Sequence, residues 1–457
     1  MIHETDFVKD IKIAYIGGGS RGWAWTLMND LKKASDISGT VYLYDIDYPA
    51  AQTNELIGNK IDGESWTYKA VETIGEALTD ADFVIISILP GTFDEMEYDV
   101  HAPEKYGVWQ SVGDTAGAGG FIRALRTVPM MRQIASNIRT YCPSATVINY
   151  TNPMAVCIGA LYREFPEIKA YGCCHEVFGT QKLLSHVLLE MEGIEASRQE
   201  IAVNVVGINH FTWFTSAKYR NIDLFELYKR FIDQHYETGY NREGLGNWMN
   251  NSFRNNARVR MDLFKRFGYV AAAGDRHLAE FMDPEDYLKD PDTVRSWMFG
   301  LTPVKWRKED LVKRLQRSKR LASGEEIYEL RNTGEEGAEQ IRALVGLDTM
   351  VTNINLPNQG QISNLPLGMI VETNAVFRND GFKPVLAGNI PESIYPMIIR
   401  GAKENEAMLD AAFSQDLNKA FCEFSKLNML KALTEKQKKE LFDEMIAGTK
   451  NYLKDYF

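Results

Sequence analysis

Cysteine and histidine residues at two separate places in the chain are of the types that bind a metal ion. Cys174 and His175 are neighbours, and Glu176 follows them. A second imidazole, His210, follows Asn209 further along the chain. A thiolate and an imidazole suit a divalent transition metal, and an open coordination position would admit a substrate. The alternative is a buried cysteine beside a histidine with a purely structural role.

A second group of ionisable residues lies close together in the second half of the chain. Asp275, Arg276, His277 and Glu280 place two acids, a guanidinium and an imidazole within a short stretch. The alternative is the exposed start of a helix, with Asp275 as its cap.

A glycine-rich segment at residues 113–126 precedes a helical pattern that contains Arg123 and Arg126. It predicts a loop that faces an anion or a substrate. A flexible connector is the alternative that its composition leaves open.

The start of the chain predicts the elements of a dinucleotide site. A strand at 11–16 runs into a glycine turn, a helix at 23–33 and a strand at 41–44 that ends at Asp45. Glycines let the backbone approach a pyrophosphate, the helix N-terminus favours its charge, and Asp45 can bind a ribose. A tight turn without a ligand is the alternative. The residues expected at the cofactor are Gly17, Gly19, Ser20, Arg21 and Asp45.

Two later segments, 81–89 and 146–150, are almost continuously apolar, as central parallel strands are. Ligands of open α/β sheets bind beyond the carboxyl ends of such strands. Ser87 and Asn152 are therefore also expected at the cofactor.

The second half of the chain is less regular. A strand at 201–208 delivers Asn209 and His210, and residues 351–376 alternate like a strand. The basic segment Lys305–Arg320 and the acidic pairs Glu325-Glu326 and Glu335-Glu336 suggest a solvated helical face. We expect a doubly wound, Rossmann-like α/β domain at 1–195, an α+β domain at 196–457 and a site in the crevice between them.

Composition excludes several classes of protein. The chain has 457 residues, 45% of them hydrophobic, and a net charge of −11, which argues against nucleic acid as a partner. Its five cysteines are scattered and predict no disulfide framework, which favours the cytoplasm. There is no signal-like start and no apolar run of ~20 residues, so we expect no membrane partner.

Six short motifs occur in an order and spacing that resemble glycoside hydrolase family 4, the NAD- and metal-dependent glycosidases. Within that family, the stretch Cys174-His175-Glu176-Val177 looks like the version found in α-galacturonidases. The matching motifs are Gly17-Gly18-Gly19-Ser20, Gly113-Asp114-Thr115 with Gly119-Gly120, Thr151-Asn152-Pro153, Cys174-His175, Gly207-Ile208-Asn209-His210 and Gly274-Asp275-Arg276-His277.

The resemblance implies hydrolysis through transient oxidation. NAD⁺ would take hydride from sugar carbon 3, a base would remove the proton on carbon 2, and the glycosidic oxygen would leave carbon 1. Water would then add and the steps would reverse. Cys174 and His210 match the ligands of a metal, expected to be Mn²⁺. His175 matches an acid for the leaving oxygen or a substrate contact, and His277 is expected to be the base, with Asp275 as the competing residue.

The resemblance also implies a uronic acid glycoside as substrate and a homo-oligomer, either a dimer or a tetramer. Arg276 and Arg123 are candidates to bind the sugar carboxylate, because an arginine can donate two parallel hydrogen bonds. Asn152 would contact the sugar near the metal, and Glu176 would face a hydroxyl.

Several alternatives remain open from the sequence. The family contains α-glucosidases, α-galactosidases and α-glucuronidases as well. Outside the family, an NAD-dependent dehydrogenase acting on a hydroxy acid or a sugar would share the Gly17–Asp45 unit, and so would a nucleotide-sensing protein without catalysis.

Overall fold

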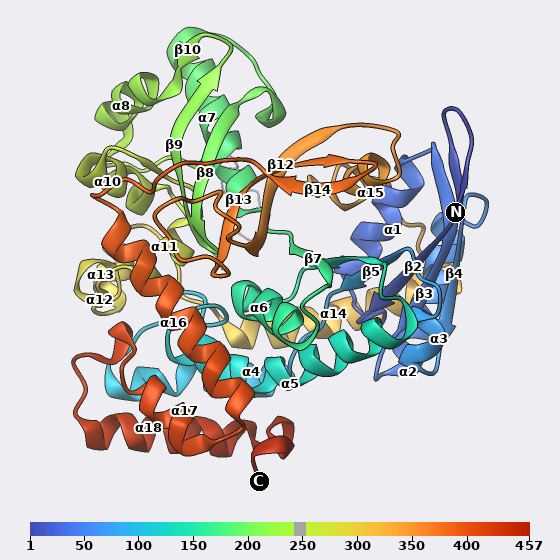
Figure 1. The fold of residues 1–457 in the computed structure, drawn as a ribbon. Coiled ribbons are helices and arrows are strands. Elements are labelled where there is room, and N and C mark those ends of the chain that lie inside the picture. The colour runs from blue at the N-terminus through green and yellow to red at the C-terminus, as the bar shows by residue number, and fades with distance from the viewer. Residues whose placement is uncertain (242–252) are drawn as a thin grey trace.

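A computed structural model of the chain describes residues 1–241 and 253–457. Within these residues, a 10-stranded sheet runs through the molecule in the order β14-β13-β12-β7-β6-β5-β2-β3-β4, with β1 paired to β2 (Figure 1). Its strands are β1 (Ile2–His3), β2 (Val8–Ile16), β3 (Ile37–Tyr44), β4 (Trp66–Val71), β5 (Phe83–Ile86), β6 (Thr146–Asn149), β7 (Lys169–Gly172), β12 (Met350–Pro357), β13 (Ile370–Arg378) and β14 (Gly381–Pro384).

The strands from β4 to β7 are parallel. Their order reverses at β2, since β3 lies on one side of it and β5 on the other. This is the doubly wound arrangement, in which ligands bind where the strand order reverses. The predicted fold class is confirmed.

Helices cover both faces of this sheet because β2 buries side chains on both sides. Ile13 and Tyr15 face a core with α1 and α2, whereas Ala14 and Ile16 face a core with α5 and α6. The helices of the chain as described are α1 (Trp23–Lys33), α2 (Tyr48–Ile61), α3 (Ile74–Leu78), α4 (Phe93–His101), α5 (Gly117–Tyr141), α6 (Met154–Glu164), α7 (Glu176–Glu192), α8 (Leu224–His235), α10 (Arg258–Phe267), α11 (Asp275–Phe281), α12 (Pro284–Tyr287), α13 (Pro291–Ser296), α14 (Val304–Ser323), α15 (Gly337–Leu344), α16 (Tyr395–Ser414), α17 (Leu417–Phe424) and α18 (Glu435–Thr449).

The glycine-rich segment is not a flexible connector, so that alternative is wrong. α5 begins at Gly117 and is buried along most of its length. A Cβ on Gly119 would lie 2.4 Å from the carbonyl oxygen of Gly113, so the glycine lets α5 start directly against the preceding loop.

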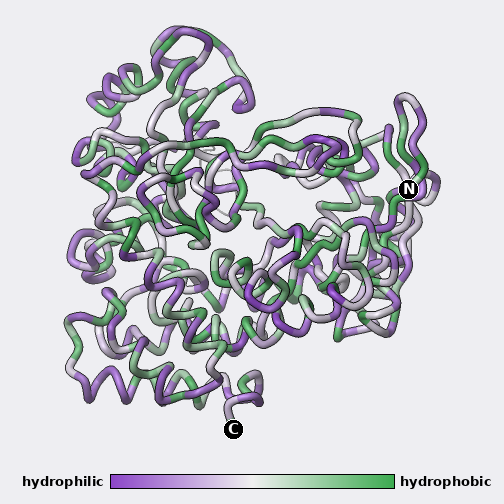
Figure 2. Tube along the Cα trace, viewed as in Figure 1, coloured by the Kyte–Doolittle hydropathy of each residue, from purple (hydrophilic) through white to green (hydrophobic). Residues whose placement is uncertain are grey.

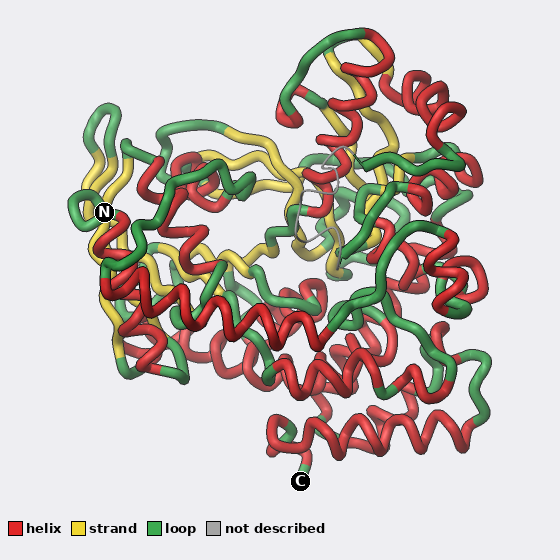
Figure 3. Tube along the Cα trace, turned by 180° about the vertical axis from the view of Figure 1, so that it is seen from behind, coloured by secondary structure: helices red, strands yellow, loops and turns green. Residues whose placement is uncertain are grey.

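A second, antiparallel sheet packs against β13 of the first through β8, and it carries the expected strand before His210. Among the described residues it contains β8 (Ala202–Ile208), β9 (Phe211–Tyr219), β10 (Ile222–Asp223) and β11 (Val270–Ala271). Seen from behind, its strands stand in the upper right of the molecule (Figure 3). α7 and α8 pack beside it around their own apolar core.

The large sheet crosses the predicted domain boundary at residue 195. β12 pairs with β7 through Asn355 and Gly172, and β13 and β14 continue the sheet from there. α16 also packs against α5 and α6. The second half of the chain therefore completes the first sheet, and the division at 195 stays a prediction.

Buried apolar residues explain why the two halves stay together. The core that contains α5 and α6 also takes side chains from α16, α17 and α18. Along these C-terminal helices hydrophobic and hydrophilic residues alternate, as Figure 2 shows at the lower left. No helix of the described chain has the length and apolar character needed to cross a membrane.

Candidate active site

The glycine turn after β2 has the geometry of an anion site. Gly17 has φ +97°, and a Cβ on it would lie 2.1 Å from the carbonyl oxygen of Ser87, so only glycine fits. The N–H of Ser20 donates to the oxygen of Gly17 and closes the turn. α1 then begins at Trp23 with no acidic residue in its first turn and no side-chain cap at Gly22. Its N-terminal N–H groups are therefore available to an anion.

The predicted acid at the end of β3 lies on this turn. Asp45 accepts from the N–H of Gly19 through Oδ2 (2.8 Å) and from the N–H of Asp47 through Oδ1 (2.9 Å). The Arg21 side chain reaches Asp47 at 3.5 Å. The structure thus brings the five N-terminal residues expected at the cofactor to one edge of the sheet. Their cofactor role stays a prediction.

Asn152, beyond the end of β6, presents an unused acceptor. Its peptide bond to Pro153 is cis, and its carbonyl oxygen accepts from Nε of Arg123 (3.1 Å). Its side-chain Oδ1 is buried and has no hydrogen-bond partner in the described part of the chain. Such buried atoms are rare, and a ligand that donates a hydrogen bond would satisfy this one.

Cys174 and His210 belong to segments from different sheets that are joined through Asn209. Cys174 follows β7 and His210 lies between β8 and β9, and both are buried. The side chain of Asn209 hydrogen bonds to the Cys174 thiol, and Thr115 Oγ1 lies 3.1 Å from His210 Nδ1. Because Thr115 holds Nδ1, Nε2 of His210 is the nitrogen that remains for a metal.

The electrostatics of the pair depend on the metal. Burial raises the pKa of the Cys174 thiol well above its ordinary value, and the negative charges of Glu372 and Glu176 raise it further. A cation is therefore needed to favour the thiolate. Burial, together with the nearby His277, lowers the pKa of His210 to about 3. The imidazole of His210 is therefore neutral and can coordinate a metal ion.

Glu176 and His277 line the same site. The rings of His210 and His277 have centroids 4.1 Å apart, and His277 Nε2 lies 3.5 Å from Glu176 Oε1. The other Glu176 oxygen accepts from the N–H of Gly274 (2.6 Å). Burial raises the pKa of Glu176, but His277, His175 and His210 outweigh it and lower it to about 2. Nδ1 of His277 is buried and has no partner among residues 1–241 and 253–457, so that nitrogen can take a proton.

The residues described hold no group of three or more His, Cys, Asp or Glu that could bind a metal. Cys174 and His210 would therefore supply two ligands and leave the other positions to substrate oxygens or water. Cys174 has a buried thiol and His210 a neutral imidazole, and Oδ1 of Asn209, which links their segments, has no partner among the described residues; these features fit such an open site.

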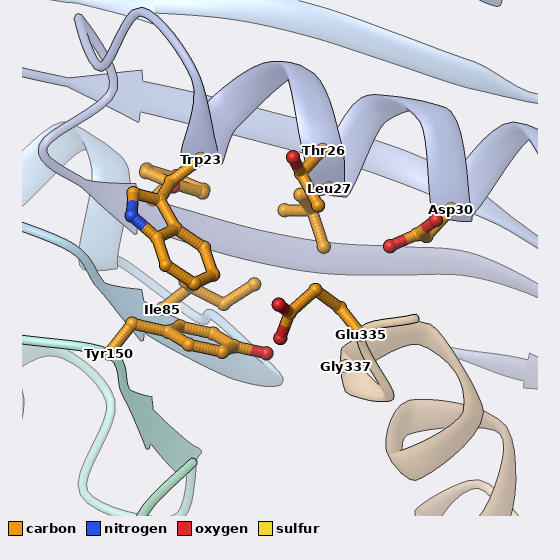
Figure 4. Close-up of a pocket in the computed structure, with 9 residues that line it drawn as sticks. Trp23, Thr26, Leu27, Asp30, Ile85, Tyr150, Glu335 and Gly337 are labelled. Atoms are coloured by element: carbon orange, nitrogen blue, oxygen red, sulfur yellow. The ribbon is translucent and has the colours of Figure 1, made fainter. Parts of the chain in front are cut away.

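His175 is held at the edge of the cofactor turn. Its Nδ1 lies 3.2 Å from Glu335 Oε1, and its ring stacks on Trp23 with centroids 6.0 Å apart. Burial lowers the pKa of His175, but the hydrogen bond and charge of Glu335 raise it to about 9. Figure 4 shows the Glu335 carboxylate near the rings of Trp23 and Tyr150, which are tilted by 31° to each other. The stacking of His175 on Trp23 links the Cys174 segment to the N-terminus of α1.

The acidic pair before α15 was wrongly predicted to be a solvated face. Glu335 binds His175, and Glu336 pairs with Arg198 at 2.8 Å. No local signal identifies Glu335, because its partner lies far away in the sequence.

Asp275 is not at the exposed start of a helix. It is fully buried, and its Oδ1 accepts from the N–H of Arg260 (3.1 Å) at the start of α10. Backbone N–H groups of Arg258 and Val259 also reach it. Its contacts are those of a cap on α10, which has no side-chain cap of its own at Ala257.

The predicted carboxylate binders are both engaged with the protein. Arg276 Nε donates to the oxygen of Gly300 (2.9 Å), and Nη2 donates to Thr302 Oγ1 (2.7 Å). Burial, then Arg307, lower the pKa of Arg276 to about 10. Arg123 is buried and donates to Asn152, as described above.

Asp114 stands between the imidazoles and the arginines, although no role was assigned to it from the sequence. Burial raises the pKa of its carboxyl, but Arg123, His277 and His210 together lower it. Its position directly after Gly113, in the glycine-rich segment, was the available signal.

Comparison with known proteins identifies the family. Residues 12–190 match the model for family 4 glycosyl hydrolases, and residues 205–425 match the model for the C-terminal domain of that family. The chain is 59% identical over 452 residues to the alpha-galacturonidase of Thermoanaerobacterium saccharolyticum, covering 98% of this chain and 97% of that protein. It is also 50% identical over 437 residues to the alpha-galacturonidase of Bacillus subtilis, covering 95% of this chain and 97% of that protein.

Solved structures agree with these matches. The crystal structure of lplD from Bacillus subtilis has 49% identity and a TM-score of 0.91, covering 96% of this chain and all (100%) of the other. A 6-phospho-alpha-glucosidase from gut microorganisms, solved with NAD and Mn²⁺, shares the fold at 21% identity and a TM-score of 0.79, covering 97% of this chain and 99% of the other. The resemblance to the family and to its α-galacturonidases is confirmed, and the dehydrogenase alternative is not supported. The chain belongs to family 4 of the glycosyl hydrolases and is a glycosidase.

Proposed function

We propose that this glycosidase cleaves α-linked galacturonides and that it uses NAD⁺ and Mn²⁺. One observation carries the proposal: Cys174, which Asn209 joins to the His210 segment, is followed by His175, and His175 stacks on Trp23 at the N-terminus of α1. The alpha-galacturonidase relatives at 50–59% identity support the substrate. The 6-phospho-alpha-glucosidase solved with NAD and Mn²⁺ supports the cofactors.

Bound at this site, NAD⁺ would supply reversible removal of hydride from sugar carbon 3, and Mn²⁺ would supply Lewis acidity next to carbons 2 and 3. Gly17, Gly19 and the N-terminus of α1 would hold the pyrophosphate. Cys174 and His210 would hold the metal, with Thr115 orienting His210.

His277 is the better base of the two candidates. Its Nε2 faces Glu176, so its unpartnered Nδ1 is left to take the proton from carbon 2. Burial lowers the pKa of His277 and keeps the ring neutral, as a base must be. Asp275 is bound at the start of α10 and positions α11, which carries His277.

His175 would donate the proton to the leaving oxygen. Nδ1 faces Glu335, which leaves Nε2 for the substrate, and a pKa of about 9 keeps the ring protonated at neutral pH. The family resemblance and the scattered cysteines support a homo-oligomer and a cytoplasmic location as parts of this proposal.

The test is a panel of uronic, neutral and phosphorylated glycosides, assayed with NAD⁺, Mn²⁺ and a thiol. We expect cleavage of the α-galacturonide, no net accumulation of NADH, and solvent deuterium at carbon 2 of the released sugar. Cleavage of a phosphorylated sugar alone would overturn the uronide proposal, and sugar release without deuterium at carbon 2 would overturn the elimination chemistry.

A further inference from the structure

Arg307 lies on one face of α14. This face runs from the glycine turn toward the catalytic cluster. Seven residues further along this helix, Arg314 donates from Nη1 to the oxygen of Arg21 (3.0 Å) at the glycine turn. Residues seven apart share a helix face and are separated by about 10 Å along the axis. α14 itself is fixed by packing on α2 and α4.

The guanidinium groups of Arg307 and Arg276 both pack on the ring of Phe253, and their charges act on each other. The Cζ atoms of Arg276 and Arg307 lie 4.7 Å and 5.1 Å from the ring centroid of Phe253. A planar guanidinium against an aromatic face has its edge directed to other partners. The stack therefore orients Arg307 without using its hydrogen-bond donors.

Arg307 differs from the other arginines at the site in its hydrogen bonds. Arg276 and Arg123 donate to protein oxygens, as described above. Nε of Arg307 is buried and has no partner in the part of the chain that is described. Arg260 also has a buried Nε without a partner among the described residues, but its charge is balanced by the buried carboxylate of Asp275.

The charges near Arg307 leave an excess of positive charge. The groups that act on it are Asp114, which is attractive, then Arg123 and Arg314, which are repulsive, and Asp310 on its own helix. Asp114 also interacts with Arg123, and the imidazoles near it, His210 and His277, are neutral. One carboxylate therefore faces two guanidinium groups, Arg123 and Arg307, which favours a second anion at this place.

We propose that Arg307 binds the carboxylate of the sugar and makes the enzyme prefer a uronic acid to a neutral hexose. This inference rests on the proposed function and replaces Arg276 and Arg123 as the carboxylate binders. A uronate bound here would satisfy the free Nε and balance the charge around Asp114. A phosphate of the dinucleotide is the other anion with similar chemistry, and Arg314 is the residue placed for it.

The test compares Arg307→Met with wild type on matched 4-nitrophenyl α-galacturonide and α-galactoside. Methionine keeps an unbranched side chain against Phe253 but removes the charge. A hydrogen bond to a charged group contributes ~1.5–3 kcal/mol, so kcat/KM for the galacturonide should fall about 10- to 150-fold. The galactoside rate should stay the same or rise, because it has no carboxylate to lose.

Binding gives a readout that does not need turnover. Calorimetry with free galacturonate should show the same fold weakening, whereas the affinity for NAD⁺, followed by protein fluorescence, should stay at the wild-type value. Lys313→Met, an exposed lysine of the same helix, is the matched control and should change neither. If Arg307→Met does not fold, Arg307→Lys should still reduce the preference for galacturonide by about tenfold.

The outcomes separate the two proposals. Wild-type enzyme that fails to cleave the galacturonide contradicts the proposed function. If wild type cleaves it but the variants keep the same ratio between the two substrates, only the role of Arg307 is wrong. Weaker NAD⁺ binding with unchanged galacturonate affinity would assign Arg307 to the dinucleotide instead.

Discussion

Replacing Glu335 with glutamine tests how the leaving group receives its proton. Glu335 lies 3.2 Å from Nδ1 of His175, and together with stacking on Trp23 it favours the imidazolium. Glutamine has nearly the same shape and can still accept a hydrogen bond, but it has no charge. The change therefore lowers the pKa of His175 and leaves the rest of the segment in place.

The size of the effect follows from the two pKa values. The pKa of His175 is about 9 with Glu335 in place, and an unperturbed histidine has a value of ~6.5. At pH 8 the protonated fraction would fall from about 90% to about 3%, a loss of about 30-fold in rate, whereas at pH 6 it would fall by less than about 1.5-fold. The His175 side chain is 51% exposed, so solvent screening makes these values upper limits.

The assay is kcat/KM against pH for two galacturonides, one with a sugar as leaving group and one with 4-nitrophenol. For Glu335→Gln the alkaline limb should move to lower pH with the sugar leaving group only, because 4-nitrophenoxide leaves without a proton. Glu325→Gln, an exposed residue between α14 and α15, is the control and should resemble wild type. A loss that is equal at all pH values and for both leaving groups would refute the reasoning and make Glu335 a structural residue.

Three further perturbations have defined outcomes. Gly17→Ala puts a methyl group against Ser87 at a positive φ, so NAD⁺ affinity measured by fluorescence should be lost, with a fall in stability of about 1–3 kcal/mol in denaturant. Asp275→Asn should lower Tm, because it weakens the cap on α10 by ~0.5–2 kcal/mol. Deuterium exchange at carbon 2 should persist at low temperature. Loss of this exchange in a folded variant would make Asp275 the base. Chelation of the metal should abolish sugar release, and added Mn²⁺ should restore it. Mn²⁺ should also slow alkylation of Cys174. A rate of alkylation that Mn²⁺ does not change would exclude Cys174 as a ligand.

The parts of the site at strand ends could be predicted from the sequence. Parallel strands place their carboxyl ends at one edge, so Gly17, Ser87, Asn152 and Cys174 had to lie near each other once their strands were identified. The helix after the glycine turn was predicted with its observed bounds, Trp23–Lys33. Such features depend on local patterns, which a sequence displays directly.

The residues supplied by distant segments could not be predicted in this way. Glu335 and Arg307 stand in charged stretches whose composition suggests a surface, and only the fold turns them toward His175 and Asp114. The alternative that Asp275 caps the exposed helix it begins is wrong, because the sequence does not say which distant helix its carboxylate reaches. Its partner is α10, and not the helix that it begins.

The connection between the halves of the chain explains why the catalytic cluster has a fixed geometry. Asn353 on β12 donates to the carbonyl oxygen of Cys174 (3.2 Å) and to the carboxylate of Glu372 on β13 (2.6 Å), which also accepts from Asn209 (3.2 Å). One buried carboxylate therefore ties the segment that carries Cys174 to the segment that carries His210. Because β12 and β13 are continuous with β7, these bonds belong to the sheet itself and do not cross a flexible hinge. The distance between the two proposed metal ligands is thus set by strand pairing, whereas His175 and Arg307, which depend on loop and helix contacts, are the parts of the site that can adapt to different sugars.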